Sequence, residues 1–305
     1  MKLTTKEVLE FLSNYYQKKI ENISPINQGE WSQAFYFDIN NLHKVIRFSN
    51  LDEDFKKDQF ANGFASDDLP IPKIEFIGQA FDGYFAISPK IDGMMIDHLD
   101  STDFNKTLPS LLKLFDALRK ADVSKTTGYG GWDQAGIGSK KSWKEFLTDV
   151  IKDDPSGRID WREKLIERAE IYKVFNHVYQ EMTKLVEYCP EDRYLIHNDL
   201  LHFNLLIKDN IVAGVIDWGC SLYGDFLYDL AMYDLWQFYY PSMKGVDFKE
   251  ETKKYYSSIG VALPNFEERL KCYEFHLTLD AMKYSAYKDN DKNLNLIANR
   301  VKELI

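Results

Sequence analysis

The chain has 305 residues, of which 45% are hydrophobic, 15% aromatic and 28% charged. This composition is ordinary for a folded globular protein and excludes a disordered chain. The formal net charge of −10 opposes binding to nucleic acid phosphates and to anionic membrane surfaces, so we expect neither as a partner and favour a cationic small molecule.

Cysteine usage and the N-terminal sequence indicate a cytoplasmic protein. The three cysteines form no C-x-x-C pair, which argues against a disulfide framework and against a thiolate zinc site. The N-terminus lacks the apolar core of a signal peptide, and no run approaches the roughly 18 apolar residues of a membrane span. The length predicts two lobes or one large domain.

The first part of the chain predicts a small antiparallel sheet. Thr4 and Glu7 form a capping box before residues that recur at helical spacing, so the chain opens with an amphipathic helix. Strands are expected at 23–28, 33–39 and 43–48, and then on either side of Asp82-Gly83, a tight-hairpin signal. A helix near 53–65 lies between them. The result is a five-stranded antiparallel sheet interrupted by one helix.

The segment from Ser88 to Gly93 is the best candidate for a hinge, because it contains proline and glycine and precedes a mainly helical region. We therefore predict an N-terminal lobe at 1–90 and a C-terminal lobe at 91–305. Within the second lobe, Gly128 to Gly138 is expected as a glycine-rich loop and 161–188 as a long helix. The predicted fold class is α+β with two lobes.

Three residues of the second lobe have the chemistry of a phosphoryl-transfer site. His197-Asn-Asp199 follows a short apolar strand, Asn204 comes five positions after Asp199, and Ile216-Asp217-Trp218 ends the next predicted hairpin. Phosphoryl transfer needs oxygen ligands for metal ions and a carboxylate that accepts the proton of the nucleophile. We assign Asp199 as catalytic base and Asn204 and Asp217 as magnesium ligands, as in the catalytic loop and D-F-G element of kinases.

Two other interpretations of these residues remain open. Asp and Asn favour turns, so each of the three could be a simple turn residue. Alternatively, His197, Asp199 and His202 have the ligand types of a metal hydrolase. We favour the kinase interpretation because all the elements occur in the required order, downstream of a five-stranded lobe and a hinge.

Residues of the first lobe could bind the nucleotide phosphates. Gly29 to Ser32 lies between the first two strands, where exposed N–H groups could cover the phosphates. Arg47 ends the third strand at the place of the phosphate-binding lysine of kinases, and a guanidinium can bind phosphate through two hydrogen bonds. Asp58 on the next helix is a candidate partner for Arg47. A surface arginine and solvated acids are the ordinary alternatives.

The hinge could recognise the adenine base through its backbone. Pro89 can offer only a carbonyl acceptor and Ile91 can offer an N–H donor, which match the two groups on the edge of adenine. ATP is therefore the expected cofactor together with Mg²⁺, and GTP is a second candidate. Gly29, Ser32, Arg47 and Asp58 complete the predicted nucleotide site.

The chain resembles the aminoglycoside phosphotransferase family, which has a protein-kinase-like fold. The resemblance rests on Gly29 to Asp38, Phe64 to Pro72, Thr127 to Trp143, His197 to Asn204 and Val215 to Asp225, so it covers roughly residues 29 to 230. It implies magnesium-dependent transfer of the γ-phosphate of ATP or GTP to a hydroxyl of an aminoglycoside or aminocyclitol, with hygromycin B among the candidates. Choline, homoserine and macrolides are acceptors of other relatives.

An aminocyclitol acceptor would need carboxylates close to its ammonium groups. Asp225, Asp229 and Asp280 are candidates by position, although helix capping is the favoured explanation for the first two. A nucleotide-binding protein of the same fold without catalytic activity is the alternative from a different functional class. The intact set of Asp199, Asn204 and Asp217 argues against it.

Overall fold

The computed structural model describes residues 2–26, 32–153, 160–201 and 203–304. The chain divides into two compact units, each built from several segments. The first contains Met1–Thr126, Trp132–Ile137 and Asp199–Ser221, and the second contains Thr127–Gly131, Gly138–Asn198 and Leu222–Ile305. In the described ranges, every helix is too short or too polar to cross a lipid bilayer.

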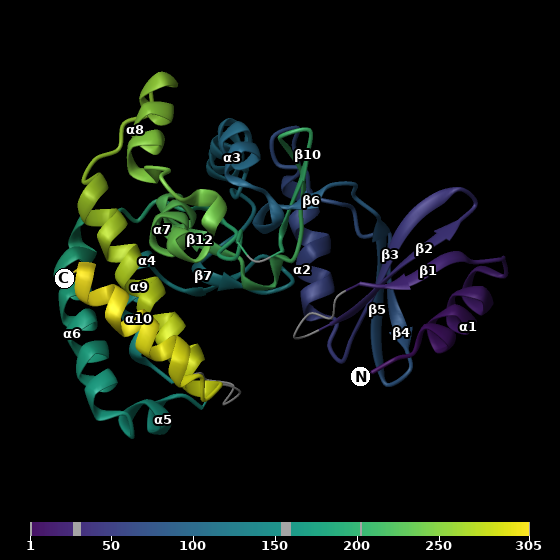
Figure 1. Ribbon diagram of the computed structural model, residues 1–305, viewed down its shortest axis with the longest axis horizontal. Coiled ribbons are helices and arrows are strands. Elements are labelled where there is room, and N and C mark those ends of the chain that lie inside the picture. The colour runs from purple at the N-terminus through teal and green to yellow at the C-terminus, as the bar shows by residue number, and fades with distance from the viewer. Residues whose placement is uncertain (1, 27–31, 154–159, 202, 305) are drawn as a thin grey trace. The chain divides into compact units, whose positions relative to one another are not determined.

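A five-stranded antiparallel sheet forms one part of the first unit (Figure 1). Its strands are β1 Glu21–Pro25, β2 Gln33–Ile39, β3 Leu42–Ser49, β4 Phe76–Ala80 and β5 Gly83–Pro89, in the order β1-β2-β3-β5-β4. The predicted sheet is therefore confirmed. The hairpin at Asp82-Gly83 is confirmed with a shift of one residue, because Gly83 already pairs with Ala80 at the start of β5.

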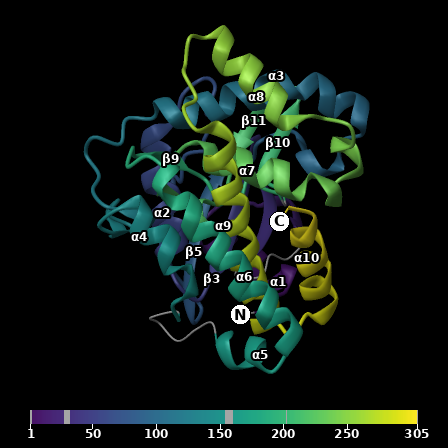
Figure 2. The same cartoon turned by 90° about the vertical axis from the view of Figure 1, so that its left-hand side faces the viewer.

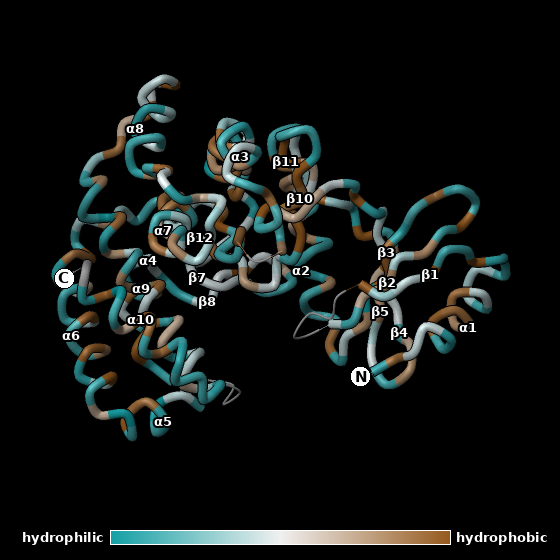
Figure 3. Tube along the Cα trace, in the orientation of Figure 1, coloured by the Kyte–Doolittle hydropathy of each residue, from teal (hydrophilic) through white to brown (hydrophobic). Residues whose placement is uncertain are grey.

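Helix α1 (Thr5–Tyr16) covers one face of this sheet. The predicted capping box is present, since the Thr4 side chain accepts from the Glu7 backbone and the Glu7 side chain accepts from the Thr4 backbone. Val8 and Leu12 are fully buried against sheet residues that include Phe37. Figure 3 shows the alternation of hydrophobic and hydrophilic positions along α1 that this packing requires.

The predicted helix near 53–65 consists of α2 (Glu53–Ala61) followed by a 3₁₀ turn at Asn62–Phe64. Phe55 anchors α2, because its side chain is 1% exposed and packs with Ile74 and Ala86. This anchoring places the buried Lys57 and Asp58 toward the rest of the first unit.

A three-stranded sheet with the order β11-β10-β6 completes the first unit. Its strands are β6 Met94–Met95, β10 Leu205–Lys208 and β11 Ile211–Val215, and helix α3 spans Ser101–Lys120. The N–H of Val215 donates to the carbonyl of Pro70 at 2.9 Å, and the N–H of Val212 donates to Ser110 Oγ at 3.0 Å. These bonds fix the hairpin that joins Asn204 to Asp217.

Seven helices and a four-stranded sheet are described in the second unit. The helices are α4 Trp143–Thr148, α5 Arg162–Ile166, α6 Ala169–Leu185, α7 Leu227–Trp236, α8 Phe248–Ser258, α9 Phe266–Tyr287 and α10 Asp291–Leu304. The strands are β7 Tyr129–Trp132, β8 Gly138–Lys140, β9 Tyr194–Ile196 and β12 Leu222–Gly224, in the order β8-β7-β12-β9. Figure 2 shows α6, α9 and α10 side by side.

Two predictions for the expected C-terminal lobe are wrong in detail. The glycine-rich segment from Gly128 to Gly138 is not simply a loop, because it contains β7 and the start of β8. Its glycines allow close backbone approach, since a Cβ on Gly128 would lie 2.4 Å from the carbonyl oxygen of Gly138. The expected helix at 161–188 is interrupted at Arg168, whose φ of −96° and ψ of 67° are not helical.

Candidate active site

Asp199 and Asn204 are in direct contact in the first unit. Asn204 Nδ2 donates to the Asp199 carboxylate Oδ2 at 2.9 Å and to the Asp199 backbone carbonyl at 2.8 Å. Asn204 is buried and Asp199 is half-buried. Both of these bonds use Nδ2 of Asn204 as the donor, and the amide oxygen Oδ1 takes no part in them. The structure thus brings together two of the three residues predicted for phosphoryl transfer.

Asp217 is tied to Asn204 through the backbone. The N–H of Ile216 donates to the carbonyl of Asn204 at 3.0 Å, so the backbone pairs at the point where Asn204 precedes β10 and Asp217 follows β11. Asp217 has a φ of 65°, which turns the chain sharply after Ile216. Its side chain is solvent-accessible through a pocket, yet surrounding protein desolvates it and, with the nearby Asp58, raises its pKa.

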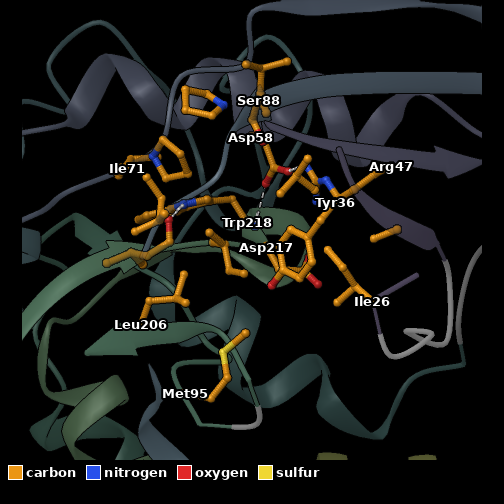
Figure 4. A pocket seen from close by; sticks show the side chains of 18 residues that line it. Ile26, Tyr36, Arg47, Asp58, Ile71, Ser88, Met95, Leu206, Asp217 and Trp218 are labelled. Atoms are coloured by element: carbon orange, nitrogen blue, oxygen red, sulfur yellow. Dashed lines mark hydrogen bonds and ion pairs between the residues drawn. The ribbon is translucent and has the colours of Figure 1, made fainter. Parts of the chain in front are cut away.

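Arg47 and Asp58 form the predicted ion pair. Arg47 Nη2 donates to Asp58 Oδ2, and Asp58 Oδ1 accepts from the backbone N–H of Trp218 at 2.8 Å (Figure 4). The Asp58 side chain is 7% exposed. Asp58 therefore connects the arginine of β3 to the turn that carries Asp217, which sequence reasoning did not anticipate.

Asp54 and Lys57 of α2 add further charges to this region. A Cβ on Gly219 would lie 3.1 Å from Asp54 Oδ1 and 3.5 Å from Asp217 Oδ1, so both carboxylates approach the same glycine. Burial and the Asp58 charge raise the pKa of Asp54. Lys57 Nζ donates to the Gly219 carbonyl, and burial lowers its pKa. The helical spacing of Asp54, Lys57 and Asp58 was the signal that could have identified this cluster.

A pocket in the first unit joins these charged groups to an apolar chamber (Figure 4). Arg47, Asp58 and Asp217 line one part of it. The predicted hinge residues Pro89 and Ile91 also line it. The apolar lining comes from Ile26, Ala34, Val45, Ile71, Ile74, Met95, Leu206, Val215 and Ile216. A pocket with an apolar part and a charged end has the chemistry to bind a purine base and the phosphates attached to it.

The remaining predicted residues lie elsewhere. Ser32 immediately precedes β2 and is not among the described residues that line the pocket. Gly29 lies outside the described residues, and so does His202 of the metal-hydrolase alternative. His197 is fully buried, which fits a supporting role in the loop. Tyr36 of β2 lines the pocket and was missed by sequence reasoning, because its position resembles any half-buried strand tyrosine.

Asp229 holds the backbone just before Asp199. Its two carboxylate oxygens accept from the N–H groups of His197 and Asn198, at 2.9 and 2.8 Å, within the second unit. The expectation that Asp229 caps its own helix is therefore wrong. Burial raises the pKa of Asp229 to about 7, although these two hydrogen bonds oppose the shift. This carboxylate fixes the two residues that lead directly into Asp199.

Asp225 and Asp280 differ in their surroundings. Asp225 is fully buried and accepts from the Arg269 guanidinium, at 2.7 and 2.8 Å, and from the Tyr273 hydroxyl. Its Oδ1 also lies 3.3 Å from the N–H of Leu227, which partly bears out the capping expectation. Asp280 is exposed and lies 3.6 Å from Lys283. Of these two, only Asp280 presents an accessible carboxylate.

The raised pKa of Asp229 predicts a pH dependence of stability. Between about pH 4 and 7 the folded state keeps a proton on Asp229 that the unfolded chain has released, so the contribution of Asp229 to the free energy of unfolding falls as pH rises and is lost above pH 7. The full change is on the order of 4 kcal/mol. In urea unfolding from pH 4 to 8, the free energy of unfolding should fall more steeply with pH in the wild type than in Asp229→Asn, and the difference is the contribution of Asp229. Asp280→Asn is the control, and equal slopes in the wild type and Asp229→Asn would contradict the assignment.

Solved structures of phosphotransferases have the same fold as this chain. A thermostable mutant of the aminoglycoside phosphotransferase APH(4)-Ia, in ternary complex with AMP-PNP and hygromycin B, has a TM-score of 0.85 and 25% identity, covering 98% of this chain and 97% of that one. Spectinomycin phosphotransferase APH(9)-Ia, at 12% identity, has a TM-score of 0.65 and covers 99% of this chain and 95% of its own, which shows likeness of fold. The α+β, protein-kinase-like fold is thereby confirmed.

Two sequence comparisons also find phosphotransferases. The model of the phosphotransferase enzyme family, APH, matches residues 133–261. Hygromycin-B 4-O-kinase of Escherichia coli is 27% identical over 290 residues, which cover 94% of this chain and 81% of the relative. The chain is therefore similar to aminoglycoside phosphotransferases over most of its length, and these relatives act on hydroxyl groups.

Proposed function

We propose that this protein transfers the γ-phosphoryl group of ATP to a hydroxyl of an aminoglycoside or aminocyclitol, with Asp199 as the catalytic base. The observation that carries the proposal is a pair of hydrogen bonds. The side-chain amide of Asn204 donates to the Asp199 carboxylate, and the N–H of Ile216, the residue before Asp217, donates to the Asn204 carbonyl. The similarity to hygromycin-B 4-O-kinase supports hygromycin B as the first acceptor to try.

Asp199 orients the acceptor hydroxyl and takes its proton as the new O–P bond forms and the bond to the leaving ADP oxygen breaks. Asn204 Nδ2 donates to Oδ2 of the Asp199 carboxylate, which fixes the orientation of the proposed base. Asp229 keeps the preceding backbone in place through two hydrogen bonds. Asn204 thus positions the side chain of Asp199, and Asp229 positions the backbone that precedes it.

The residues present fit a magnesium nucleotide. Asn204 Oδ1 and Asp217 are oxygen donors of the kind that Mg²⁺ takes, with phosphate oxygens and water completing six ligands. Bound Mg²⁺ would neutralise charge on the phosphates. Arg47 would bind phosphate oxygens while Asp58 orients its guanidinium, and Pro89 and Ile91 would bind the adenine edge. Gly29 and Ser32 belong to the same proposed nucleotide site.

The net charge of −10 supports a cationic acceptor. GTP as donor, and choline, homoserine or a macrolide as acceptor, are the alternatives within the same chemistry. A cytoplasmic location and a lobe boundary near residues 90 and 91 remain predictions of the sequence. A nucleotide-binding protein without transferase activity is the alternative of another class.

Magnesium-dependent formation of a phosphorylated product tests the function. The purified protein is incubated with ATP or GTP and with hygromycin B, other aminoglycosides, macrolides, choline or homoserine, and products are detected by mass spectrometry. We expect one acceptor class to gain one phosphoryl group. Removal of Mg²⁺ by EDTA should abolish the product, and added Mg²⁺ should restore it. Nucleotide binding without any product would favour the non-catalytic alternative.

A further inference from the structure

Phe203 occupies an unfavourable position that neither backbone geometry nor packing explains. It lies between Asp199 and Asn204, its φ is 67°, and its side chain is 53% exposed. A bulky residue rarely adopts the left-handed conformation, because its Cβ approaches the following carbonyl oxygen. Glycine would adopt this conformation without strain. The chain therefore presents a large apolar ring to solvent where a smaller residue would fit better.

The Phe203 ring contacts a second exposed ring. The His98 ring lies 5.8 Å away between centroids, at an interplanar angle of 68°. His98 ends the 3₁₀ turn Ile96–His98, which directly follows β6, and β6 pairs with β10 just after Asn204. The Phe203–His98 pair is thus an exposed aromatic surface in the first unit, supported by the β11-β10-β6 sheet.

Phe203 is linked to the proposed base through its neighbour in sequence. Phe203 is the covalent neighbour of Asn204, whose amide is 2.9 Å from the Asp199 carboxylate. An acceptor larger than one hydroxyl group must extend from Asp199 over neighbouring residues of the loop 199–204. Because aromatic faces attract cations, a ring that bears an ammonium group suits such a surface.

We propose that Phe203, backed by His98, is a specificity-determining residue that receives an ammonium-bearing ring of the acceptor. The proposal rests on the proposed function, because it concerns the acceptor of the same reaction. The strained backbone at this position then has a purpose: it presents the ring toward the substrate instead of the core. Phe203 would set acceptor affinity, while Asp199 performs the proton transfer.

Phe203→Gly tests the proposal. Glycine tolerates the φ of 67°, so the melting temperature should not fall, whereas the KM for the acceptor phosphorylated by the wild type should rise about tenfold. The KM for ATP should change less than that for the acceptor. Phe203→Tyr keeps an aromatic face and should retain the wild-type acceptor KM. The acceptor probe is hygromycin B or whichever member of the panel gives product.

Phe81→Gly is the matched control. Phe81 is also an exposed phenylalanine with positive φ, at 48% exposure and 53°, but it lies in the β4–β5 turn and packs against Phe11. It should lose stability without a rise in acceptor KM. If Phe203→Gly raises the acceptor KM no more than Phe81→Gly does, the inference is wrong and the proposed function stands. If the wild type phosphorylates no acceptor, both are wrong.

Discussion

Replacing Asp199 by alanine should lower kcat by about 10²- to 10⁴-fold, because it removes the group that accepts the hydroxyl proton. Nucleotide affinity should persist, since the groups proposed to bind phosphate and adenine lie on other elements, chiefly β3 and the hinge. Steady-state kinetics with the identified acceptor gives kcat, and calorimetric titration with Mg²⁺ and AMP-PNP gives nucleotide affinity. A kcat equal to that of the wild type would remove Asp199 from the mechanism.

The matched control for this experiment is Asp209→Ala. Asp209 lies in the turn between β10 and β11 of the same hairpin, is exposed and has a φ of 53°. No hydrogen bond or ion pair joins Asp209 to the proposed site residues in the described part of the chain. It should therefore leave kcat close to the wild-type value. A similar loss in both variants would indicate damage to the hairpin instead of loss of a base.

The fold was predictable where local signals agree with the tertiary structure. The capping box at Thr4 and Glu7, the alternation along 33–39 and the turn near Asp82-Gly83 each specify a local geometry that packing then preserves. It was harder to predict which sheet each of the short strands would join, namely β6, β7, β8, β9 and β12. Each has two to four residues, and its pairing depends on partners distant in sequence.

The site was predictable at the level of residue types and less so at the level of partners. Arg47 was expected to pair with Asp58, and the structure contains that pair. The sequence could not indicate that Asp58 also accepts from the Trp218 N–H, 160 residues away, because a backbone donor has no sequence signature. Asp229 illustrates the same limit: helix capping is the common local role of aspartate, and a long-range contact with His197 and Asn198 replaced it.

Breaking the Arg47–Asp58 pair should destabilise the protein and weaken nucleotide binding, and the two effects can be separated. Asp58→Leu leaves the Arg47 guanidinium and the Trp218 N–H without their partner, at a cost of about 3–5 kcal/mol. Arg47→Met leaves a carboxylate that is 7% exposed and should cost a similar amount. Urea unfolding measures both costs.

The double variant Arg47→Met/Asp58→Leu should recover much of this stability, because neither charge of the pair is then left without the other. Loss of the Asp58 acceptor of the Trp218 N–H should still cost about 1–3 kcal/mol. Nucleotide affinity should not recover, and titration with Mg²⁺ and AMP-PNP should show a loss of about 10- to 100-fold in Arg47→Met and in the double variant.

Lys44→Met is the control for the Arg47 variants. Lys44 lies on β3, as Arg47 does, but it pairs with Glu75, which is more exposed than Asp58, and it is not among the described residues that line the pocket. Its loss should cost at most about 1 kcal/mol and spare nucleotide affinity. If the double variant binds nucleotide as the wild type does, Arg47 has only a structural role. If its instability equals the sum of the single variants, the two side chains do not act as a pair. Recovery of stability without recovery of binding would mean that Asp58 serves to hold a phosphate-binding arginine in place.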